Sequence, residues 1–282
     1  MVRGRVGIVG LGLVGGSVAK ALAAAGTPAW GCDLDASTER LALVETIAGI
    51  LDDAVLPTCE LVVLAGWPGS VGPWLEANAA RLAPGAIVMD VAGVKRGVCR
   101  RARAACEALP VAFVGCHPMA GSHRGGFEHA RADLFRGAPM AVVPPALDDP
   151  GRADVLLRLE ELLAPCGFGS WSACDADEHD AVVAYTSQLA HLVSSAYAKS
   201  PTALRRRGLS AGSWRDLTRV AELSAPMWAE LFEADADHLL VELDRMVAEL
   251  GRYRDAIAAG DHDGLGALLE EGTRMKREAD AL

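Results

Sequence analysis

The sequence predicts an α/β domain built on a parallel sheet, followed by an all-helical C-terminal domain. In the first half of the 282-residue chain, short apolar runs alternate with segments of helical pattern, which is typical of repeated β-α units. A glycine-rich turn directly follows the first of these runs. From about residue 172 onward only helical patterns remain. We therefore expect two domains, residues 1–172 and 173–282.

The expected strands are short apolar runs bounded by turn residues. They cover residues 5–9, 29–33, 61–65, 86–90, 111–115 and 140–143, and a final β-α-β element ends at 169–171. Residues 15–25 have the pattern of a helix between the first two strands. Because parallel strands need crossover connections, we expect helices on both faces of the sheet.

The second half has three long segments of helical pattern. The first covers residues 175–198 and has apolar residues at helical spacing. The second, residues 226–259, is expected to be one long helix with Ser224 as its N-cap and a stop at residues 260–261. The last covers about residues 263–281.

Charge and cysteine content exclude several classes of protein. The formal net charge is −10 and no basic stripe interrupts the acidic background, so no nucleic-acid partner is expected. Seven scattered cysteines without a Cys-x-x-Cys pair predict neither a disulfide framework nor a metal site. Five glycines within residues 7–16 distinguish the N-terminus from a signal peptide, and no run is long enough to span a membrane. These features predict a soluble, cytoplasmic protein.

The glycine-rich turn has the spacing Gly10-x-Gly12-x-x-Gly15 between the first expected strand and helix. Gly10 permits the tight turn, Gly12 lets the backbone approach a pyrophosphate, and Gly15 allows the helix to pack closely on the strand. The first helical N–H groups, near Leu13 and Val14, would face the phosphates. The pattern predicts a Rossmann-type dinucleotide site, and a purely structural glycine turn is the alternative.

Asp33 stands at the end of the second expected strand. An acid at this position accepts hydrogen bonds from the adenosine ribose, and its charge repels the 2′-phosphate of NADP. NAD is therefore the predicted cofactor. Arg40 could pair with such a phosphate, but we expect it to face solvent.

Five segments resemble, in family order, motifs of the prephenate and arogenate (cyclohexadienyl) dehydrogenases. They are residues 90–95 (Asp-Val-Ala-Gly-Val-Lys), 115–122 (Gly-Cys-His-Pro-Met-Ala-Gly-Ser), 132–139 (Ala-Asp-Leu-Phe, then Ala-Pro), 177–191 (Asp-Glu-His-Asp, then Ser-Gln-Leu-Ala-His) and 214–219 (Trp-Arg-Asp-Leu-Thr-Arg). The resemblance implies an NAD-dependent oxidoreductase of tyrosine biosynthesis. It also implies a helical domain that binds substrate and joins two copies into a homodimer.

The implied reaction oxidises ring C4 and removes the C1 carboxylate of a small cyclohexadienyl substrate, prephenate or arogenate. On the resemblance, His117 accepts the proton of the C4 hydroxyl, because a neutral imidazole can act as a base near neutral pH. A structural histidine before Pro118 is the alternative. Arg219 would bind a substrate carboxylate with two parallel hydrogen bonds, supported by Arg215 one turn earlier. An exposed helix arginine is the alternative reading of Arg219.

Further substrate and cofactor contacts follow from the other matched segments. His191, four residues after Ser187 on the same helical face, would help to bind the substrate; a core-facing histidine is the alternative. Lys95 would steady its loop or the cofactor, and a surface lysine is the alternative.

Three positions depart from the family pattern. Gly93 replaces the usual serine near the catalytic histidine, and Gln188 replaces the first histidine of Ser-His-Leu-x-His. Residues 66–68, Gly-Trp-Pro, replace the usual Thr-Pro after the strand that ends near residue 65. Gly93 is expected to leave room beside His117, and Gln188 to contact the substrate without becoming cationic.

These departures keep other functions open. The same reaction on 4-amino-4-deoxyprephenate, in a specialised pathway, would use the room at Gly93 and the neutral amide of Gln188. A non-catalytic NAD-binding sensor is a remoter alternative. A β-hydroxyacid or imine dehydrogenase shares the domain plan but would not explain the segments at residues 115–122 and 214–219.

Overall fold

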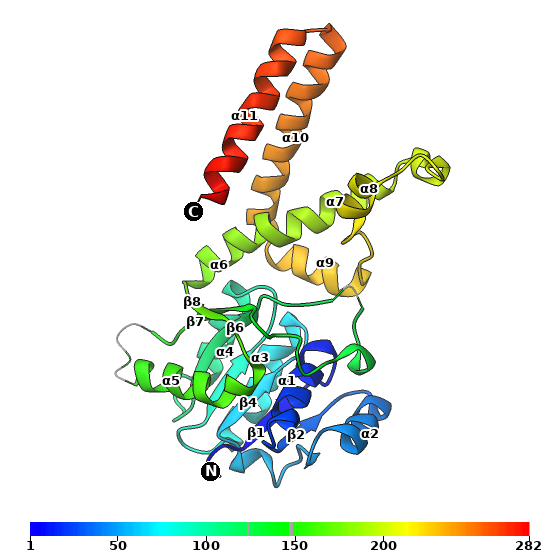
Figure 1. Ribbon diagram of the computed structural model, residues 1–282. Coiled ribbons are helices and arrows are strands. Elements are labelled where there is room, and N and C mark those ends of the chain that lie inside the picture. The colour runs from blue at the N-terminus through cyan, green and yellow to red at the C-terminus, as the bar shows by residue number, and fades with distance from the viewer. Residues whose placement is uncertain (123, 147–148, 150, 282) are drawn as a thin grey trace. The chain divides into compact units, whose positions relative to one another are not determined.

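A computed structural model describes residues 1–122, 124–146, 149 and 151–281. Its sheet has the strand order β3-β2-β1-β4-β5-β6-β7-β8 (Figure 1). The strands are β1 (Val6–Val9), β2 (Ala29–Cys32), β3 (Gly49–Ile50), β4 (Leu61–Leu64), β5 (Ile87–Asp90), β6 (Ala112–Pro118), β7 (Pro139–Val143) and β8 (Ser170–Ala173). The predicted Rossmann-type fold is confirmed, with the first switch in strand order between β1 and β4.

Two details of the sheet differ from the expectation. The two-residue strand β3 was not predicted, because so short a run has no periodicity of its own. Strand β7 pairs antiparallel with β6, placing Ala141 opposite His117, whereas every other strand pair is parallel. The chain therefore reverses its direction between β6 and β7, and the described part of this loop contains a short helical turn at Phe127–His129.

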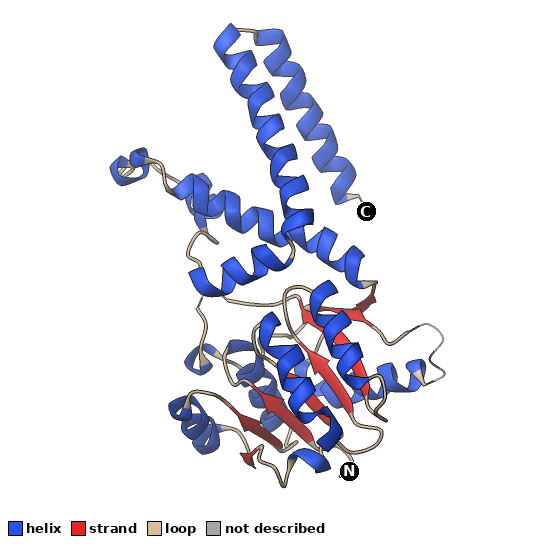
Figure 2. Ribbon diagram, turned by 180° about the vertical axis from the view of Figure 1, so that it is seen from behind, coloured by secondary structure: helices blue, strands red, loops and turns tan. Residues whose placement is uncertain are grey.

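The central strands β1, β4, β5 and β6 are mostly buried, as a parallel sheet covered by helices requires (Figure 2). In β4, Leu61 and Val63 pack into one core while Val62 and Leu64 pack into the other. Helices α1 (Leu13–Ala24) and α5 (Arg152–Leu163) contribute to the first core. Helices α3 (Pro68–Asn78) and α4 (Arg96–Cys106) contribute to the second. Helix α2 (Ala36–Glu45) follows β2.

A nearly continuous helical segment follows the sheet. It consists of α6 (Ala176–Val183), a π-helical stretch (Ala184–Leu189) and α7 (Ala190–Ala198). Asp175 caps its first turn by accepting hydrogen bonds from the N–H groups of Asp177 and Glu178. Helices α8 (Gly212–Thr218) and α9 (Ala225–Ala234) come next. By internal contacts, residues 1–235 form one compact unit, which includes these helices and the sheet.

Residues 236–282 form a second unit, whose described part is a helical hairpin. Helix α10 (Ala236–Ala259) pairs with α11 (His262–Asp280) through an Arg252–Glu271 ion pair of 2.9 Å and a hydrogen bond from the Tyr253 hydroxyl to the carbonyl of Leu268. None of the described helices is long and apolar enough to cross a membrane. The domain boundary expected near residues 172–173 stays a prediction.

The prediction of one helix over residues 226–259 is wrong. Helix α9 ends at Ala234 and α10 begins at Ala236, because Asp235 adopts φ −127° and ψ 28°. Its carboxylate is buried and accepts a hydrogen bond from the Gln188 amide at 3.0 Å. It also lies 3.5 Å from the Arg96 guanidinium. A tertiary contact therefore ends the helix, and helical periodicity carries no signal of it.

The turn from β1 into α1 depends on two of its glycines. Gly10 has φ +89°, a conformation that side chains disfavour, and a Cβ there would lie 2.7 Å from the carbonyl oxygen of Ala65. A Cβ on Gly15 would lie 1.9 Å from the carbonyl oxygen of Gly10. The strand and the helix thus approach more closely than any other residue would allow.

We expect Gly15→Ala to lower the free energy of unfolding by roughly 1–3 kcal/mol, since the added methyl group meets backbone that cannot easily move. Gly97→Ala is the matched control, because nothing lies within 4 Å of a Cβ at that position in α4. It should raise stability by about 0.5–1 kcal/mol. Urea unfolding of both variants measures the difference, and equal stabilities would contradict the close packing at Gly15.

Candidate active site

Most of the predicted site residues of the first unit lie at the carboxyl edge of the sheet, where open α/β sheets bind ligands. The glycine-rich turn follows β1, the loop from Gly93 to Lys95 follows β5, and His117 is the penultimate residue of β6. Strands β1, β5 and β6 run in the same direction, so the segments that follow them lie at the same edge of the sheet. The structure therefore brings the predicted cofactor loop and the predicted base to the same side of the domain.

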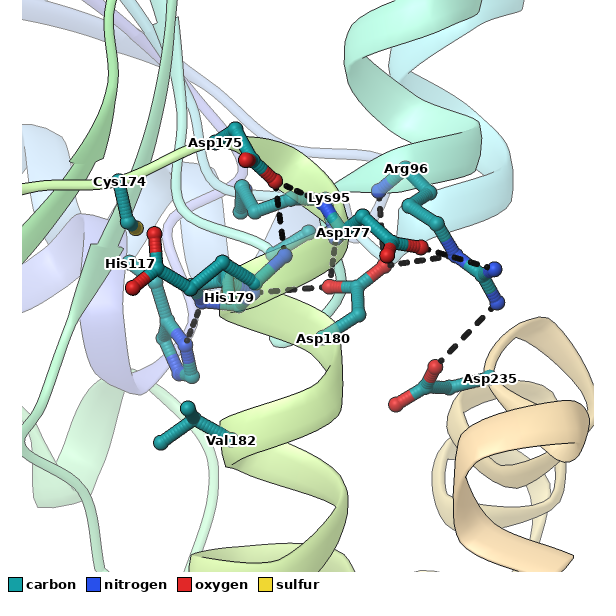
Figure 3. Close-up of polar contacts among 12 residues, drawn as sticks. Lys95, Arg96, His117, Cys174, Asp175, Asp177, His179, Asp180, Val182 and Asp235 are labelled. Atoms are coloured by element: carbon teal, nitrogen blue, oxygen red, sulfur yellow. Dashed lines mark hydrogen bonds and ion pairs between the residues drawn. The ribbon is translucent and has the colours of Figure 1, made fainter. Parts of the chain in front are cut away.

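His117 contacts a second histidine that comes from helix α6 (Figure 3). Its Nδ1 atom lies 3.0 Å from Nε2 of His179, and Nδ1 of His179 lies 2.8 Å from Oδ1 of Asp180. His179 and Asp180 are buried, whereas His117 keeps part of its surface accessible. Burial of its ring, followed by its interactions with His179 and Lys95, holds the pKa of His117 well below 6.5. The ring is therefore neutral near neutral pH and able to accept a proton.

Asp180 connects this histidine pair to the start of helix α4. Its Oδ1 atom accepts a hydrogen bond of 2.6 Å from the N–H of Lys95, and Oδ2 accepts one of 2.8 Å from the N–H of Arg96. Burial acts to raise the pKa of Asp180, but hydrogen bonds from His179 and from these two backbone groups hold it below its ordinary value. The carboxylate therefore stays ionised at the positive end of the α4 dipole.

Lys95 is fully buried, so the surface-lysine alternative is wrong. Its Nζ atom forms an ion pair with Asp90, which is also fully buried. The second oxygen of Asp90 accepts a hydrogen bond of 3.2 Å from the N–H of Cys116, the residue before His117. The pair therefore connects the β5–α4 loop to β6, and the expected role of Lys95 toward its loop or the cofactor stays a prediction.

The expected open space at Gly93 is not present. A Cβ on this residue would lie 3.2 Å from a methyl carbon of Leu231, which comes from α9. An apolar side chain thus packs over the position where the family motif has serine. The sequence did not predict this contact, because Leu231 lies 138 residues after Gly93 in the chain.

The cofactor loop has the form that a dinucleotide needs. A Cβ on Gly12 would meet nothing within 4 Å, so the turn presents open backbone in front of the first turn of α1, where Leu13, Val14 and Gly15 begin the helix. Asp33 follows β2, and its Oδ2 accepts a hydrogen bond of 2.6 Å from the N–H of Leu11. The predicted ribose acceptor is therefore held against the loop itself.

Two of the expected substrate-binding residues, His191 and Arg219, lie on the helical segments. Burial, and in smaller part the charge of Arg219, lowers the pKa of His191. Nδ1 of His191 lies 2.8 Å from the carbonyl oxygen of Ser187, and its ring stacks on Trp228 with centroids 4.1 Å apart. Arg219 is exposed at the C-cap of α8. A guanidinium, an imidazole and an indole face suit a planar carboxylate ligand.

The remaining expected substrate contacts are placed less directly. Arg215 is exposed on α8 and pairs with Asp216 at 3.5 Å. Gln188 is buried in the π-helical stretch, its amide donates to Asp235, and its Oε1 atom has no partner among the described residues. Ser187 is partly exposed beside it. The roles of these three residues in substrate binding stay predictions.

Sequence reasoning did not assign roles to His179, Asp180 or Trp228. The first two belong to the matched Asp-x-His-Asp segment, so a signal was present, but their contact with His117 spans 62 residues. Trp228 lies outside the segments that match the family motifs. Its stacking on His191 is known only from the position of α9 in the structure.

A glycine-rich turn on a parallel sheet, with a neutral histidine at the same edge, defines a nucleotide-dependent dehydrogenase. The family description "Prephenate dehydrogenase, nucleotide-binding domain" matches residues 18–167 of this chain. "Prephenate dehydrogenase, dimerization domain" matches residues 175–271. The chain belongs to the prephenate dehydrogenase family, whose members are oxidoreductases that carry out oxidative decarboxylation in tyrosine biosynthesis. This membership decides against the β-hydroxyacid and imine dehydrogenase alternatives.

Individual relatives agree with the family. The cyclohexadienyl dehydrogenase of Zymomonas mobilis is 32% identical, over 96% of this chain and 94% of its own length. The crystal structure of Synechocystis arogenate dehydrogenase is 28% identical and superposes with a TM-score of 0.78, covering 98% of this chain and 99% of that one. A prephenate dehydrogenase from A. aeolicus, solved with hydroxyphenyl propionate and NAD+, has a TM-score of 0.81 at 22% identity, covering 99% and 98%. The last likeness shows the fold.

The position of Asp33 leads to a test of cofactor choice. We expect the protein to prefer NAD to NADP, and Asp33→Ser to narrow this preference. The KM for NAD should rise roughly tenfold, because a hydrogen bond to a charged acceptor is lost. Steady-state kcat/KM values for the two cofactors measure the effect, with Asp244→Ser on α10 as a control for loss of one negative charge. Equal or better use of NADP by the unchanged protein would contradict the role of Asp33.

Proposed function

We propose that the protein catalyses the NAD-dependent oxidative decarboxylation of prephenate or arogenate. The observation that carries this proposal is His117, a neutral, partly accessible imidazole at the sheet edge that also holds the glycine-rich turn. Membership of the family supplies the reaction class. The fit of the β1–α1 turn to a pyrophosphate and the position of Asp33 support NAD as the cofactor.

The proposed reaction balances as follows. NAD, held by the turn from Gly10 to Gly15 and by Asp33, would accept the hydrogen on ring C4 as hydride. The proton of the C4 hydroxyl passes to Nε2 of His117. The bond between C1 and its carboxylate breaks to give carbon dioxide, and its electron pair enters the ring, which becomes aromatic. The new phenolate oxygen then takes up a proton to give the product.

Substrate binding is assigned to the helical segments. Arg219 and His191 would bind the carboxylate that remains on the side chain, and Arg215 would add a positive charge on α8. Ser187 and Gln188 would complete this side of the site. The stacked ring of Trp228 would cover an apolar face of the ligand.

Neither alternative function gains support from the structure. The 4-amino substrate was favoured by room at Gly93 and by a free amide at Gln188. Leu231 fills the first position, and the amide of Gln188 donates to Asp235. A non-catalytic sensor would not need a neutral histidine at the sheet edge.

A homodimer is part of the proposal. The dimerization description covers residues 175–271. On one face of helix α10, the apolar residues Val247, Leu250 and Ile257 are 60%, 58% and 64% exposed. Such a row of apolar side chains is typical of a protein interface. The proposed division of labour is a cofactor domain over residues 1–172 and a substrate-binding and dimerisation domain over residues 173–282.

His117→Asn tests the base. The substitution should lower kcat by roughly 10²–10⁴-fold, the range that general acid–base catalysis contributes, while substrate KM changes far less. Because the pKa of His117 is lowered, the unchanged enzyme should keep its activity as pH falls past 6.5 and lose it only when the imidazole becomes protonated. Formation of NADH from prephenate and from arogenate across this pH range is the measurement.

Arg219→Ala is the contrasting variant in the same assay. It removes a ground-state contact, so it should raise KM and leave kcat nearly unchanged. Near-normal turnover by His117→Asn would refute the base, and no NADH from either substrate with the unchanged protein would refute the proposed reaction.

The quaternary structure has its own test. Light scattering at micromolar concentration should give the mass of two 29.4-kDa chains. Replacing Val247 and Leu250 together by Glu should shift the protein toward monomer, because charges would be buried in the interface. Glu249→Ala on the same helix should leave the dimer intact. A monomeric unchanged protein would contradict the proposal.

A further inference from the structure

We propose that His179 and Asp180 are positioning residues that fix the tautomer and the orientation of His117, leaving its Nε2 atom free to accept the substrate proton. The inference rests on the proposed function, because it gives His117 the role of base. Its basis is the chain of contacts from His117 through His179 to Asp180 (Figure 3).

The chain begins at a carboxylate that can only accept hydrogen bonds. Asp180 is ionised and fully buried, and two backbone N–H groups at the start of α4 hold its oxygens in place. The ring atom 2.8 Å from Oδ1 is Nδ1 of His179, so this nitrogen must carry a hydrogen. In the proposed arrangement this is the only hydrogen on the ring nitrogens of His179, so its Nε2 is unprotonated.

The same reasoning then applies to His117. Its Nδ1 atom lies 3.0 Å from Nε2 of His179, and two nitrogens at this distance share one hydrogen. Because His179 Nε2 is the acceptor, His117 Nδ1 is the donor. The neutral His117 ring is then unprotonated at Nε2, the nitrogen that does not face His179 and that a base in this reaction must use.

The contacts also stabilise His117 after it has accepted the proton. The ring then carries a positive charge, and Lys95, whose charge acts to keep His117 neutral, opposes it. Asp180 supplies a negative charge one ring away, through a hydrogen bond that strengthens as His117 becomes cationic. Asp90 is paired with Lys95, and Arg96 lies 3.7 Å from Asp180, so the net charge around the histidines is nearly balanced.

This contact from α6 lies beside a position, Gly93, that offers His117 no side chain. The family motif places a serine hydroxyl near the catalytic histidine, and Gly93 has none. A Cβ at this position would make a tight contact of 3.2 Å with a methyl carbon of Leu231. Among the described residues, the side chain that forms a hydrogen bond with His117 is His179.

The first experiment needs neither substrate nor cofactor. Nitrogen-15 NMR of the full chain, labelled at histidine and recorded at neutral pH, distinguishes protonated from unprotonated ring nitrogens. The variants His117→Asn and His179→Gln assign the signals, because each variant lacks the two ring-nitrogen signals of the substituted histidine. We expect Nδ1 of both rings to be protonated and Nε2 of His117 to be unprotonated. A protonated Nε2 on His117 would overturn the proposal.

The second experiment is kinetic. His179→Leu removes the acceptor and should lower kcat about 10²-fold, the lower end of the general-base range, with KM for prephenate, arogenate and NAD nearly unchanged. His179→Gln keeps an acceptor oxygen and should recover roughly tenfold of that loss. His262→Gln, an exposed histidine at the start of α11, is the control and should behave as the unchanged enzyme.

The outcomes separate this inference from the proposed function. Normal kcat in His179→Leu, together with a large loss in His117→Asn, overturns the positioning role and leaves the base intact. A loss in His179→Leu accompanied by weaker NAD binding and a lower Tm shows a purely structural role and also overturns it. If the unchanged protein oxidises neither substrate, the proposed function fails, and the NMR result alone decides whether the tautomer is fixed as inferred.

Discussion

The buried carboxylate of Asp180 is the contact on which the geometry of the candidate site depends. A charge without water is costly unless several donors surround it, and here two backbone N–H groups and a histidine ring do so. The backbone bonds join residues 85 positions apart, Asp180 on α6 and Lys95 at the start of α4. Any movement of α6 relative to the sheet would break them, so the helix and the strand edge keep one relative position.

Several other charged groups are buried close to Asp180 in the first unit. Lys95 and Asp90 are fully buried beneath His117, and Arg96 extends the network to Asp235. Within this low-dielectric surrounding, charges act strongly on any neighbouring ring. A histidine in water would titrate near neutral pH. Here burial and a nearby lysine keep it neutral, and the opposed carboxylate keeps proton uptake feasible.

Much of the fold could be predicted because it depends on local patterns. Short apolar runs identified most of the strands, and the spacing of Gly10, Gly12 and Gly15 identified the cofactor turn. The break at Asp235 and the antiparallel pairing of β7 could not be predicted, since both depend on contacts between distant segments. His117 was found through its motif. Its partner His179 lay in a matched segment as well, but motif order does not say which side chains meet.

Gly93 shows how a local departure changes meaning once packing is known. Taken alone, loss of the serine suggested free space and a different substrate. The structure places Leu231 over this position, so the loss of a hydroxyl comes with an apolar contact from α9. The base still has one polar group to orient it, the histidine of the matched Asp-x-His-Asp segment. His179 supplies that group from α6, and Asp180 fixes His179 by the bonds that anchor α6 to the sheet. Orientation of the base and attachment of the helical segment therefore depend on one carboxylate.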